Sequence, residues 1–482
     1  MAMSQSETTK ATAAFQHKPE HEIGSGTMCS ALIVAAPHSG SGKTTVTAAL
    51  ARYHRNQGRK VTVFKVGPDF IDPMILRQAS GELVYQLDLW LVGEKGCQAL
   101  LHRAAMESDL ILIEGVMGLF DGTPSSADLA QYFSIPVLGV IDAKAMAQTF
   151  AAVTFGLAKL REDLPFSGVI ANRVNTERHA ELLSSSLPKE FRFYGRLPKD
   201  DGVTLPERHL GLVQAQELAD IDSQLDQAAG HIAKTDLTEL PKKVEFFAVE
   251  NDSQEDFIHR ALVGTRVIIV RDNAFSFIYA ANIAFLEQTG AEITYCSALS
   301  DAHLPQGDIL YIPGGYPELY AEKLMSNDTF LNDVKDFAAS NKPIIAECGG
   351  MLYLLEQLTD MSGQQMPMLG LIPGKAAMQK KLAAIGSQWV DLSALDKGNI
   401  ESEISSDNNK IKAPNNIMRG HSFHYSSAEI DLTPISQTTH HPSERAGEYV
   451  YQHNNILASY MHWYFPSNPG LTLSIFNKNR CF

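Results

Sequence analysis

Short apolar runs alternate with longer segments of helical periodicity over most of the chain. The segment 145–160 is apolar on nearly every side, which predicts a buried helix. This alternation is typical of an α/β fold built on parallel sheets. In the first half, the strand predictions are 31–36, 61–66, 109–114, 136–142, 168–174 and 192–197.

A second alternation of the same kind begins at residue 265 and continues to about residue 355. Beyond it, residues 366–482 have more β patterning and more turn residues. Between the two alternations, residues 214–262 are polar and acidic and contain no clean strand pattern, which predicts a terminal helix followed by a linker. In this half the strand predictions are 265–272, 292–298 and 308–315, and the helix predictions are 278–289 and 329–340.

These patterns divide the chain into four parts. The first 27 residues are polar and lack the apolar core of a secretory signal, so we interpret them as a disordered leader. The polar run 401–410 is interpreted as a surface loop. The expected division is a leader at 1–27, a first α/β domain at 28–235, a linker at 236–264 and a second domain at 265–482.

A phosphate-binding loop follows the first strand. The sequence ALIVAAPHSGSGKTT (31–45) is an apolar strand, a Gly/Ser loop and the start of a helix. Backbone N–H groups of such a loop bind phosphates, while Lys43 reaches the β and γ oxygens and the Thr44 hydroxyl ligates Mg²⁺. The first glycine of the usual motif is Pro37 here. The loop residues expected to bind ATP are Ser39, Gly40, Ser41, Gly42, Lys43, Thr44 and Thr45.

Acidic residues follow two other strands. Glu114 ends the strand 109–114 and Asp121 lies in the glycine-rich loop after it, while KVGPDFIDP (65–73) contributes Asp69 and Asp72. Each carboxylate alone is more often a turn former, but together at consecutive strand ends beside a phosphate-binding loop they favour a metal site. We expect Thr44, Asp69 and Glu114 to bind Mg²⁺. Lys65 is expected to contact the nucleotide.

Cys348 lies between an apolar run and an apolar helix in PIIAECGGMLYLL (343–355). The pattern predicts a strand, a sharp turn forced by Gly349 and Gly350, and a helix, an arrangement that exposes the side chain at its corner. Such a corner favours the thiolate and a nucleophilic role. The alternative is a small buried cysteine with a structural role.

An acyl-transfer nucleophile also needs a base and donors for an oxyanion. Gly314 and Gly315 follow a strand, so they and Gly349 are the expected oxyanion residues. His462 follows the apolar run of LASYMHWYF (457–465), and residue patterns alone leave it little ahead of His424. The histidines considered as the base are His421, His424, His440, His441, His453 and His462.

Composition limits the classes of protein to which the chain can belong. The chain has 44% hydrophobic and 20% charged residues, as in ordinary globular enzymes, and a net charge of −15 that argues against nucleic acid as a partner. Its five cysteines lack CxxC spacing, so neither a zinc site nor a disulfide framework is indicated. No apolar run reaches the length of a membrane span, and we expect a cytoplasmic enzyme without a membrane partner.

Seven ordered motifs over about residues 30–470 together resemble the cobyrinate a,c-diamide synthase family of cobalamin biosynthesis. They are AAPHSGSGKTT, GPDFIDP, EGVMGLFDG, PGGYPE, AECGGMLYL, RGHSFHYS and SYMHWYF. The resemblance implies an N-terminal P-loop domain similar to dethiobiotin synthetase. It also implies a C-terminal class I glutamine amidotransferase domain with a flavodoxin-like sheet.

The family uses L-glutamine, ATP and Mg²⁺ to amidate the a and c acetate groups of a corrin ring. By resemblance, Cys348 would attack glutamine with His462 as its base, and the P-loop site would form an acyl phosphate that ammonia attacks. Many class I amidotransferases place Glu two residues after this histidine, where the chain has Tyr464. The third member of the site is therefore unidentified.

Two alternatives stay open at this stage. Cobyric acid synthase and the nickel-sirohydrochlorin a,c-diamide synthase would share both sites and differ in their tetrapyrrole. A P-loop ATPase switch with a degenerate amidotransferase domain would lack glutaminase activity. Homodimerisation, the presence of cobalt in the substrate, the order of amidation and the path of ammonia are open. We expect the segment 214–262 to carry any adjustment between the two sites.

Overall fold

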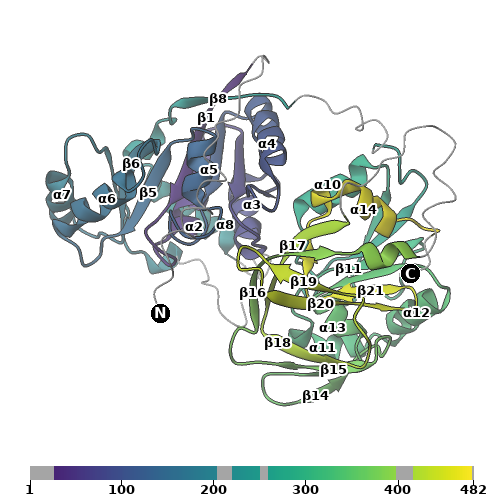
Figure 1. Ribbon diagram of the computed structural model, residues 1–482. Coiled ribbons are helices and arrows are strands. Elements are labelled where there is room, and N and C mark those ends of the chain that lie inside the picture. The colour runs from purple at the N-terminus through teal and green to yellow at the C-terminus, as the bar shows by residue number, and fades with distance from the viewer. Residues whose placement is uncertain (1–25, 204–219, 250–258, 398–415, 480–482) are drawn as a thin grey trace, which may run out of the picture. The chain divides into compact units, whose positions relative to one another are not determined.

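The computed structural model describes residues 26–203, 220–249, 259–397 and 416–479, and the chain forms two compact units, Met1–Glu250 and Asn251–Phe482 (Figure 1). Residues 1–25 of the expected leader and the expected surface loop 401–410 lie outside the described residues. No helix within the described ranges is long and apolar enough to cross a membrane. Each unit is described separately below.

The first unit is a mostly parallel sheet with the strand order β3-β2-β4-β1-β5-β6-β7, and β8 pairs antiparallel with β1. The strand predictions for this half are confirmed, each to within a few residues. The strands are β1 (Thr27–Ala35), β2 (Val61–Lys65), β3 (Tyr85–Gln86), β4 (Leu110–Glu114), β5 (Val137–Asp142), β6 (Phe166–Asn172), β7 (Phe193–Arg196) and β8 (Lys243–Phe246).

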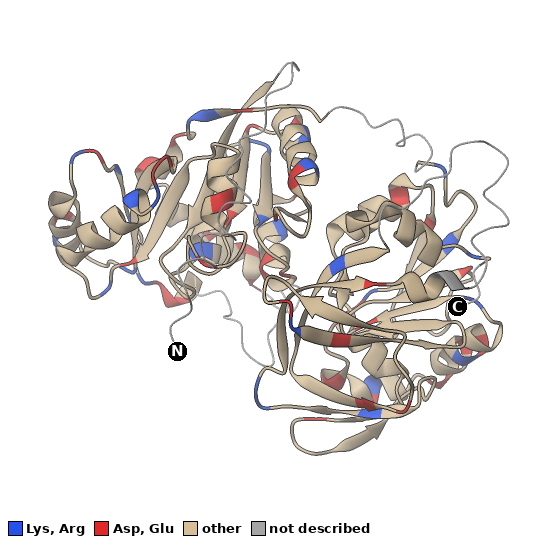
Figure 2. Cartoon of the chain, in the orientation of Figure 1, with Lys and Arg blue, Asp and Glu red and all other residues tan. Residues whose placement is uncertain are grey.

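Helices cover both faces of this sheet. Alternate β1 residues face two different cores: Ala31 and Ile33 pack with α4 to α7, whereas Leu32 and Val34 pack with α2, α3 and α8. Burial on both faces explains why the central strands β1, β4 and β5 are mostly apolar, and Figure 2 shows little charge on the strands of this sheet. The helices are α2 (Lys43–Asn56), α3 (Ile71–Ser80), α4 (Glu94–Glu107), α5 (Ser126–Tyr132), α6 (Thr149–Lys159), α7 (Glu177–Ser186) and α8 (Ile221–Ile232).

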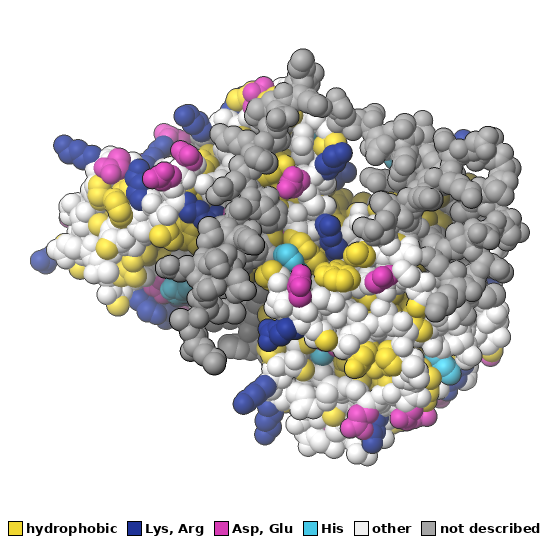
Figure 3. All heavy atoms as spheres, in the orientation of Figure 1, with side chains coloured by type: hydrophobic (Ala, Val, Ile, Leu, Met, Phe, Trp, Pro, Cys, Tyr) yellow, Lys and Arg dark blue, Asp and Glu magenta, His cyan; other side chains and the backbone are white. Residues whose placement is uncertain are grey.

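Two expectations for this unit were wrong. Helix α6 is not buried all round, because Phe155 is 53% and Leu160 70% exposed, and apolar side chains reach the surface where Figure 1 places α6 and α7 (Figure 3). The range 214–262 is not free of strands either, since β8 lies within it and inside the range 236–264 assigned to a linker. An edge strand as short as β8, with the sequence KVEF, has too weak a pattern to be recognised.

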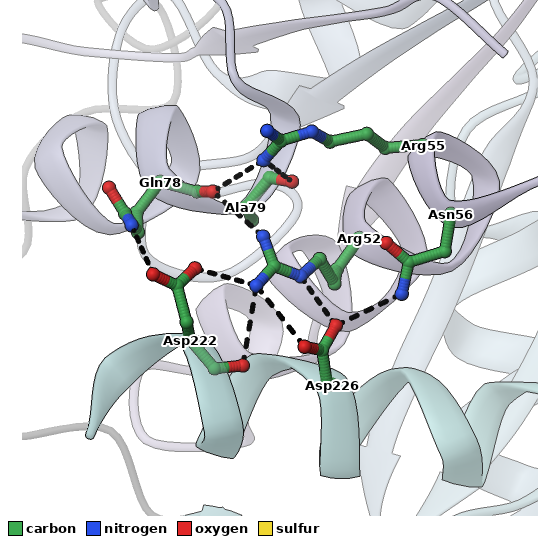
Figure 4. A network of polar contacts seen from close by, with 7 residues as sticks. All are labelled: Arg52, Arg55, Asn56, Gln78, Ala79, Asp222 and Asp226. Carbon is green, nitrogen blue, oxygen red and sulfur yellow. Dashed lines mark hydrogen bonds and ion pairs between the residues drawn. The ribbon is translucent and has the colours of Figure 1, made fainter. Parts of the chain in front are cut away.

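A polar network fastens α8 to the helix that follows the phosphate-binding loop (Figure 4). Arg52 on α2 is largely buried, and its guanidinium lies 2.7 Å from Asp226 and 2.6 Å from Asp222 on α8. Asn56 donates to Asp226, and Gln78 on α3 donates to Asp222. The network therefore joins three helices on one face of the sheet.

The second unit contains a ten-stranded sheet with the order β10-β9-β11-β12-β21-β20-β19-β16-β17-β22 and a separate four-stranded sheet with the order β14-β13-β15-β18. Strands β10, β9, β11, β12 and β21 are parallel and the remaining pairings of the large sheet are antiparallel. The expected strands and the β-rich end are confirmed.

The strands of the large sheet are β9 (Arg266–Val270), β10 (Glu292–Cys296), β11 (Ile309–Ile312), β12 (Ile344–Glu347), β16 (Ala384–Asp391), β17 (Ile417–His424), β19 (Ser436–His440), β20 (Ala446–His453), β21 (Ile456–Ser459) and β22 (His462–Trp463). The small sheet has β13 (Gln357–Thr359), β14 (Gln365–Pro367), β15 (Gly374–Met378) and β18 (Ser426–Ile430). The helices are α10 (Ala280–Gln288), α11 (Ala321–Met325), α12 (Asp328–Ala339), α13 (Gly349–Leu354) and α14 (Pro469–Ile475).

The far end of the large sheet curves back towards its centre. Strand β22 begins three residues after β21 ends, yet it pairs with β17, four places from β21 in the strand order. A sheet can join such strands only by bending. The bend brings His462 on β22 close to the end of β12, where Cys348 follows.

The Arg52 network generates a prediction about stability. Replacement of Arg52 by Met removes two ion pairs while keeping most of the buried volume, so the first unit should lose about 1–3 kcal/mol of unfolding free energy. The more exposed Arg55 bonds only to backbone carbonyls, and Arg55→Met should cost less than about 0.5 kcal/mol. Urea unfolding of both variants measures the difference, and equal losses would show that the α8 carboxylates contribute nothing.

Candidate active sites

The phosphate-binding loop lies between β1 and α2, at the centre of the first sheet. Its backbone is left-handed at Gly40 and Gly42, with φ of 78° and 94°. A Cβ on Gly42 would collide with the side chain of Asn172, which donates to the Ser41 carbonyl at 2.9 Å from the end of β6. Asn172 therefore supports the loop, a role that sequence analysis missed because one polar residue after a strand is an ordinary turn signal.

Two loop side chains already make defined contacts. Lys43 Nζ donates to the Met117 carbonyl at 2.6 Å, in the loop after β4. Thr44 Oγ1 donates to Glu114 Oε1 at 2.6 Å, and the parallel register places Glu114 beside Val34 of β1. The expected pairing of the loop with the end of β4 is therefore present in the structure.

Lys65 lies among carboxylates at the end of β2. Its ammonium is 2.8 Å from Asp72, 3.2 Å from Glu114 and 4.0 Å from Asp69, and the residue is 1% exposed. Lys65 thus neutralises the acidic group directly, and its expected contact with the nucleotide stays a prediction. Buried carboxylates at three neighbouring positions require such a counter-charge.

The acidic candidates other than Glu114 differ in the groups that their carboxylates contact. Asp69 Oδ1 accepts the Ile71 N–H and Asp121 Oδ2 accepts the Gly118 N–H, so both shape turns. Asp72, on α3, is the carboxylate closest to Lys65, and its charge raises the pKa of Glu114. Within the described ranges, no group of three His, Cys, Asp or Glu side chains is arranged to hold a metal ion.

Glu114 has a buried carboxylate oxygen that could bind a cation. It is 1% exposed, and its Oε2 atom is buried without a hydrogen-bond partner in the structure. Burial raises the pKa of Glu114 to about 7, against the opposing effect of Lys65. A divalent cation beside the Thr44 hydroxyl would satisfy that oxygen, so the residues fit Mg²⁺.

The second candidate site is the corner after β12. Cys348 has a φ of 46° and a ψ of −108°, between β12 and the short helix α13. Its N–H donates to the Ser459 carbonyl at 2.7 Å, which continues the pairing of β12 with β21. The expected strand, corner and helix are confirmed, but the strained residue is the cysteine itself. The expectation of an exposed side chain was wrong, because Cys348 is buried and only 5% exposed.

Glycine is needed next to Cys348 because the backbone there packs closely against other segments, and not because the turn requires a glycine conformation. A Cβ on Gly349 would lie 2.8 Å from the Gly315 N and O atoms, and a Cβ on Gly350 would collide with the Ile312 carbonyl. A Cβ on Gly314 would collide with the His462 ring. The sequence pattern assigned these glycines to a turn. The structure shows that they are needed because three backbone segments approach one another closely at this corner.

The six candidate histidines differ in burial and in the groups that they contact. His462 and His421 are paired across β22 and β17, with stacked rings 5.0 Å apart. His424 lies on the same strand as His421, but it bonds to the Ser426 carbonyl and to Glu448 and stacks on Tyr460. His440, His441 and His453 are half-buried residues of the antiparallel half of the sheet. His462 is thus the candidate that packs against the Gly314 backbone.

The Cys348 thiol and the His462 imidazole are both buried, and burial favours their neutral forms. Burial, with a smaller effect of Glu318, raises the pKa of the Cys348 thiol, so the expectation of a thiolate at rest was wrong. Burial and the neighbouring His421 hold the pKa of His462 well below its usual range. A neutral imidazole can accept the thiol proton when a substrate arrives, so the pair suits general-base activation.

Comparison with known proteins gives matches to both units. A family model described as the CobQ/CobB/MinD/ParA nucleotide binding domain matches residues 32–213. Another, described as the CobB/CobQ-like glutamine amidotransferase domain, matches residues 266–470. The two-domain α/β fold expected from the sequence is thereby confirmed.

Three relatives match nearly the whole chain. The hydrogenobyrinate a,c-diamide synthase of Stutzerimonas stutzeri is 51% identical over 441 residues, covering 92% of this chain and 97% of that protein. The Pseudomonas aeruginosa protein of the same name is 49% identical, covering 92% and 96%. The cobyrinate a,c-diamide synthase of Herminiimonas arsenicoxydans is 42% identical over 447 residues, covering 92% and 96%.

The environment of Glu114 generates a prediction about pH. Because its folded pKa of about 7 exceeds its ordinary 4.5, folding favours the protonated form, and the stability it contributes below pH 4.5 is lost as pH rises through 7. Glu114→Gln mimics the protonated form, so its thermal midpoint should equal wild type at pH 5 and exceed it at pH 8 without Mg²⁺. If the thermal midpoints of Glu114→Gln and wild type differed by the same amount at pH 5 and pH 8, the raised pKa of Glu114 would be contradicted.

Proposed function

The chain belongs to the cobyrinate and hydrogenobyrinate a,c-diamide synthase family, and we propose that it converts the a and c acetate carboxylates of a corrin acid to amides. ATP activates each carboxylate and glutamine supplies the ammonia. The observation that carries the proposal is the presence, in one chain, of a P-loop facing a buried carboxylate and of a strained cysteine corner beside a neutral histidine.

The glutaminase half begins with His462 taking the proton of the Cys348 thiol as sulfur attacks the glutamine amide carbon. Backbone N–H groups of Gly315 and Gly349 are suited to stabilise the oxyanion, with Gly314 packed against the imidazole. Return of the proton to the leaving nitrogen releases ammonia and leaves a glutamyl thioester. Water then hydrolyses the thioester to glutamate and restores the thiol.

The synthetase half activates the corrin carboxylate, which is a poor acyl donor. The loop residues Ser39 to Thr45 would hold the phosphates of ATP, and Lys43 would exchange the Met117 carbonyl for phosphate oxygens. Transfer of the γ-phosphoryl group to the corrin carboxylate gives an acyl phosphate, from which ammonia displaces phosphate. Mg²⁺ bound there would neutralise charge on the phosphates, with Thr44, Glu114 and either Asp69 or Asp72 as its protein ligands.

The substrate is proposed from the relatives. The two proteins at 51% and 49% identity are named for hydrogenobyrinate and the one at 42% for cobyrinate, which favours hydrogenobyrinate here. A cytoplasmic enzyme without nucleic-acid or membrane partners fits this substrate. An ATPase switch with a degenerate second domain is disfavoured, because the cysteine corner and its histidine are both present.

The test of the proposal separates the two nitrogen sources. Cys348→Ser should lower glutamine-dependent amidation of hydrogenobyrinate by about 1000-fold or more, while amidation with high free ammonia continues. His462→Ala should behave in the same way, and the matched variant His424→Ala should retain most glutamine-dependent activity. Loss of both activities in folded Cys348→Ser would contradict separate sites, and no amidation of either corrin acid by wild type would overturn the proposed function.

The metal ligands can be distinguished by Mg²⁺ titration. Asp72 lies nearer than Asp69 to the Lys65 ammonium beside Glu114, so Asp72→Asn should raise the Mg²⁺ concentration needed for half-maximal turnover by about 10-fold or more. Asp69→Asn, which keeps an acceptor for the Ile71 N–H, should change it less. The reverse order would assign the site to Asp69.

A further inference from the structure

The position that usually completes this kind of site holds no carboxylate. Tyr464 lies two residues after His462, and its ring packs edge-on against Tyr279 at 5.4 Å. A phenol in that contact supplies no negative charge to an imidazolium. The chemistry still benefits from one, because proton transfer from a thiol to a buried histidine creates a cation in a region that disfavours it.

A carboxylate from another strand lies beside the histidine. Glu347, the last residue of β12, places its Oε2 atom 3.9 Å from Nδ1 of His462, and both side chains are 1% exposed. Glu347 is also the residue directly before Cys348. Glu347 therefore ends the strand, and the strained residue Cys348 follows it directly.

Neighbouring groups hold the Glu347 side chain in place. The Tyr311 hydroxyl donates to Oε2 at 2.8 Å, and the Trp463 N–H donates to Oε1 at 3.1 Å. Asn282 in turn binds the Trp463 carbonyl and the Phe465 N–H, at 2.7 and 2.8 Å. These bonds fix the carboxylate relative to the backbone of β22, which carries His462.

We propose that Glu347 is the positioning residue of the glutaminase site, orienting the His462 imidazole through Nδ1 and stabilising its protonated form while Cys348 attacks glutamine. The inference rests on the proposed glutaminase function. Glu347 acts through His462 and does not touch the substrate. Shortening of the 3.9 Å separation when the imidazole gains its proton would complete the hydrogen bond.

The proposal predicts a pH dependence. Burial raises the pKa of Glu347 to about 8, while the bonds from Tyr311 and Trp463 oppose the rise. The carboxylate form therefore grows as pH rises through about 8, and glutaminase activity should grow with it. The other titratable groups around His462 are Tyr311 on β11, His421 and His424 on β17, Cys348 and Tyr279.

A purely structural role for Glu347 makes different predictions. As a tether between β12, Tyr311 and β22, it would affect folding and the placement of the whole corner, and its loss would lower stability and glutamine binding together. Glu347→Gln keeps an acceptor for the Trp463 N–H and nearly the same volume but removes the charge. This variant therefore separates the two roles.

The experiment measures glutamine hydrolysis and ammonia-dependent amidation of full-length Glu347→Gln from pH 6 to 9. The kcat for glutamine hydrolysis should fall about 100-fold, with KM changed less than threefold. The rise in activity through pH 8 should disappear, and ammonia-dependent amidation should remain. Glu448→Gln, which removes the carboxylate bound to His424, is the matched control and should retain the wild-type pH profile.

Tyr311→Phe provides a second test that leaves the charge in place. Loss of the hydroxyl bond should raise the pKa of Glu347 further and shift the rising limb of activity to higher pH. A Glu347→Gln enzyme with wild-type kcat, or one that keeps the pH limb, would overturn the proposal. Wild type without glutaminase activity would instead refute the proposed function, so the two failures are distinguishable.

Discussion

The second unit depends on a strained backbone at Cys348. A non-glycine residue at φ 46° and ψ −108° costs on the order of 1–3 kcal/mol, and it persists only where the surroundings hold it. Here the Cys348 N–H bonds to Ser459 on β21, and the Gly349 and Gly350 backbones pack against the turn after β11. The same constraint that strains the cysteine also aligns it with the segment that leads to His462.

Both units place their chemistry at the carboxyl ends of central parallel strands, where backbone groups are no longer used in the sheet. Both also bury carboxylates there. Glu114 has Lys65 and Thr44 as partners and an unsatisfied oxygen, and Glu347 has Tyr311 and a backbone N–H. Burial raises the pKa of each carboxylate because it disfavours the charged form. A nearby cation, Mg²⁺ at Glu114 or an imidazolium at Glu347, would stabilise that charged form.

The α/β fold, most strands, the phosphate-binding loop and the cysteine corner could be predicted because their signals are local. Apolar runs mark strands buried on both faces, and the glycine-rich loop and the AECGG corner carry their own geometry. Longer-range features could not be predicted. One face of α6 is exposed although it carries apolar residues such as Phe155, β8 is an edge strand of four residues, and the pairing of β22 with β17 depends on the bend of the sheet. The same limit applies to Glu347 and Asn172, since their partners lie far away in sequence.

The most direct test of a reactive cysteine corner is detection of the acyl-enzyme. Rapid acid quenching during glutamine turnover, followed by peptide mass spectrometry, should reveal a glutamyl thioester on Cys348. The other three described cysteines, Cys29, Cys97 and Cys296, are buried like Cys348 and serve as internal controls in the same digest. A glutamyl adduct confined to Cys348 and absent from Cys348→Ser is the predicted result. Steady glutamine hydrolysis with no adduct on Cys348, or with one on another cysteine, would contradict the account.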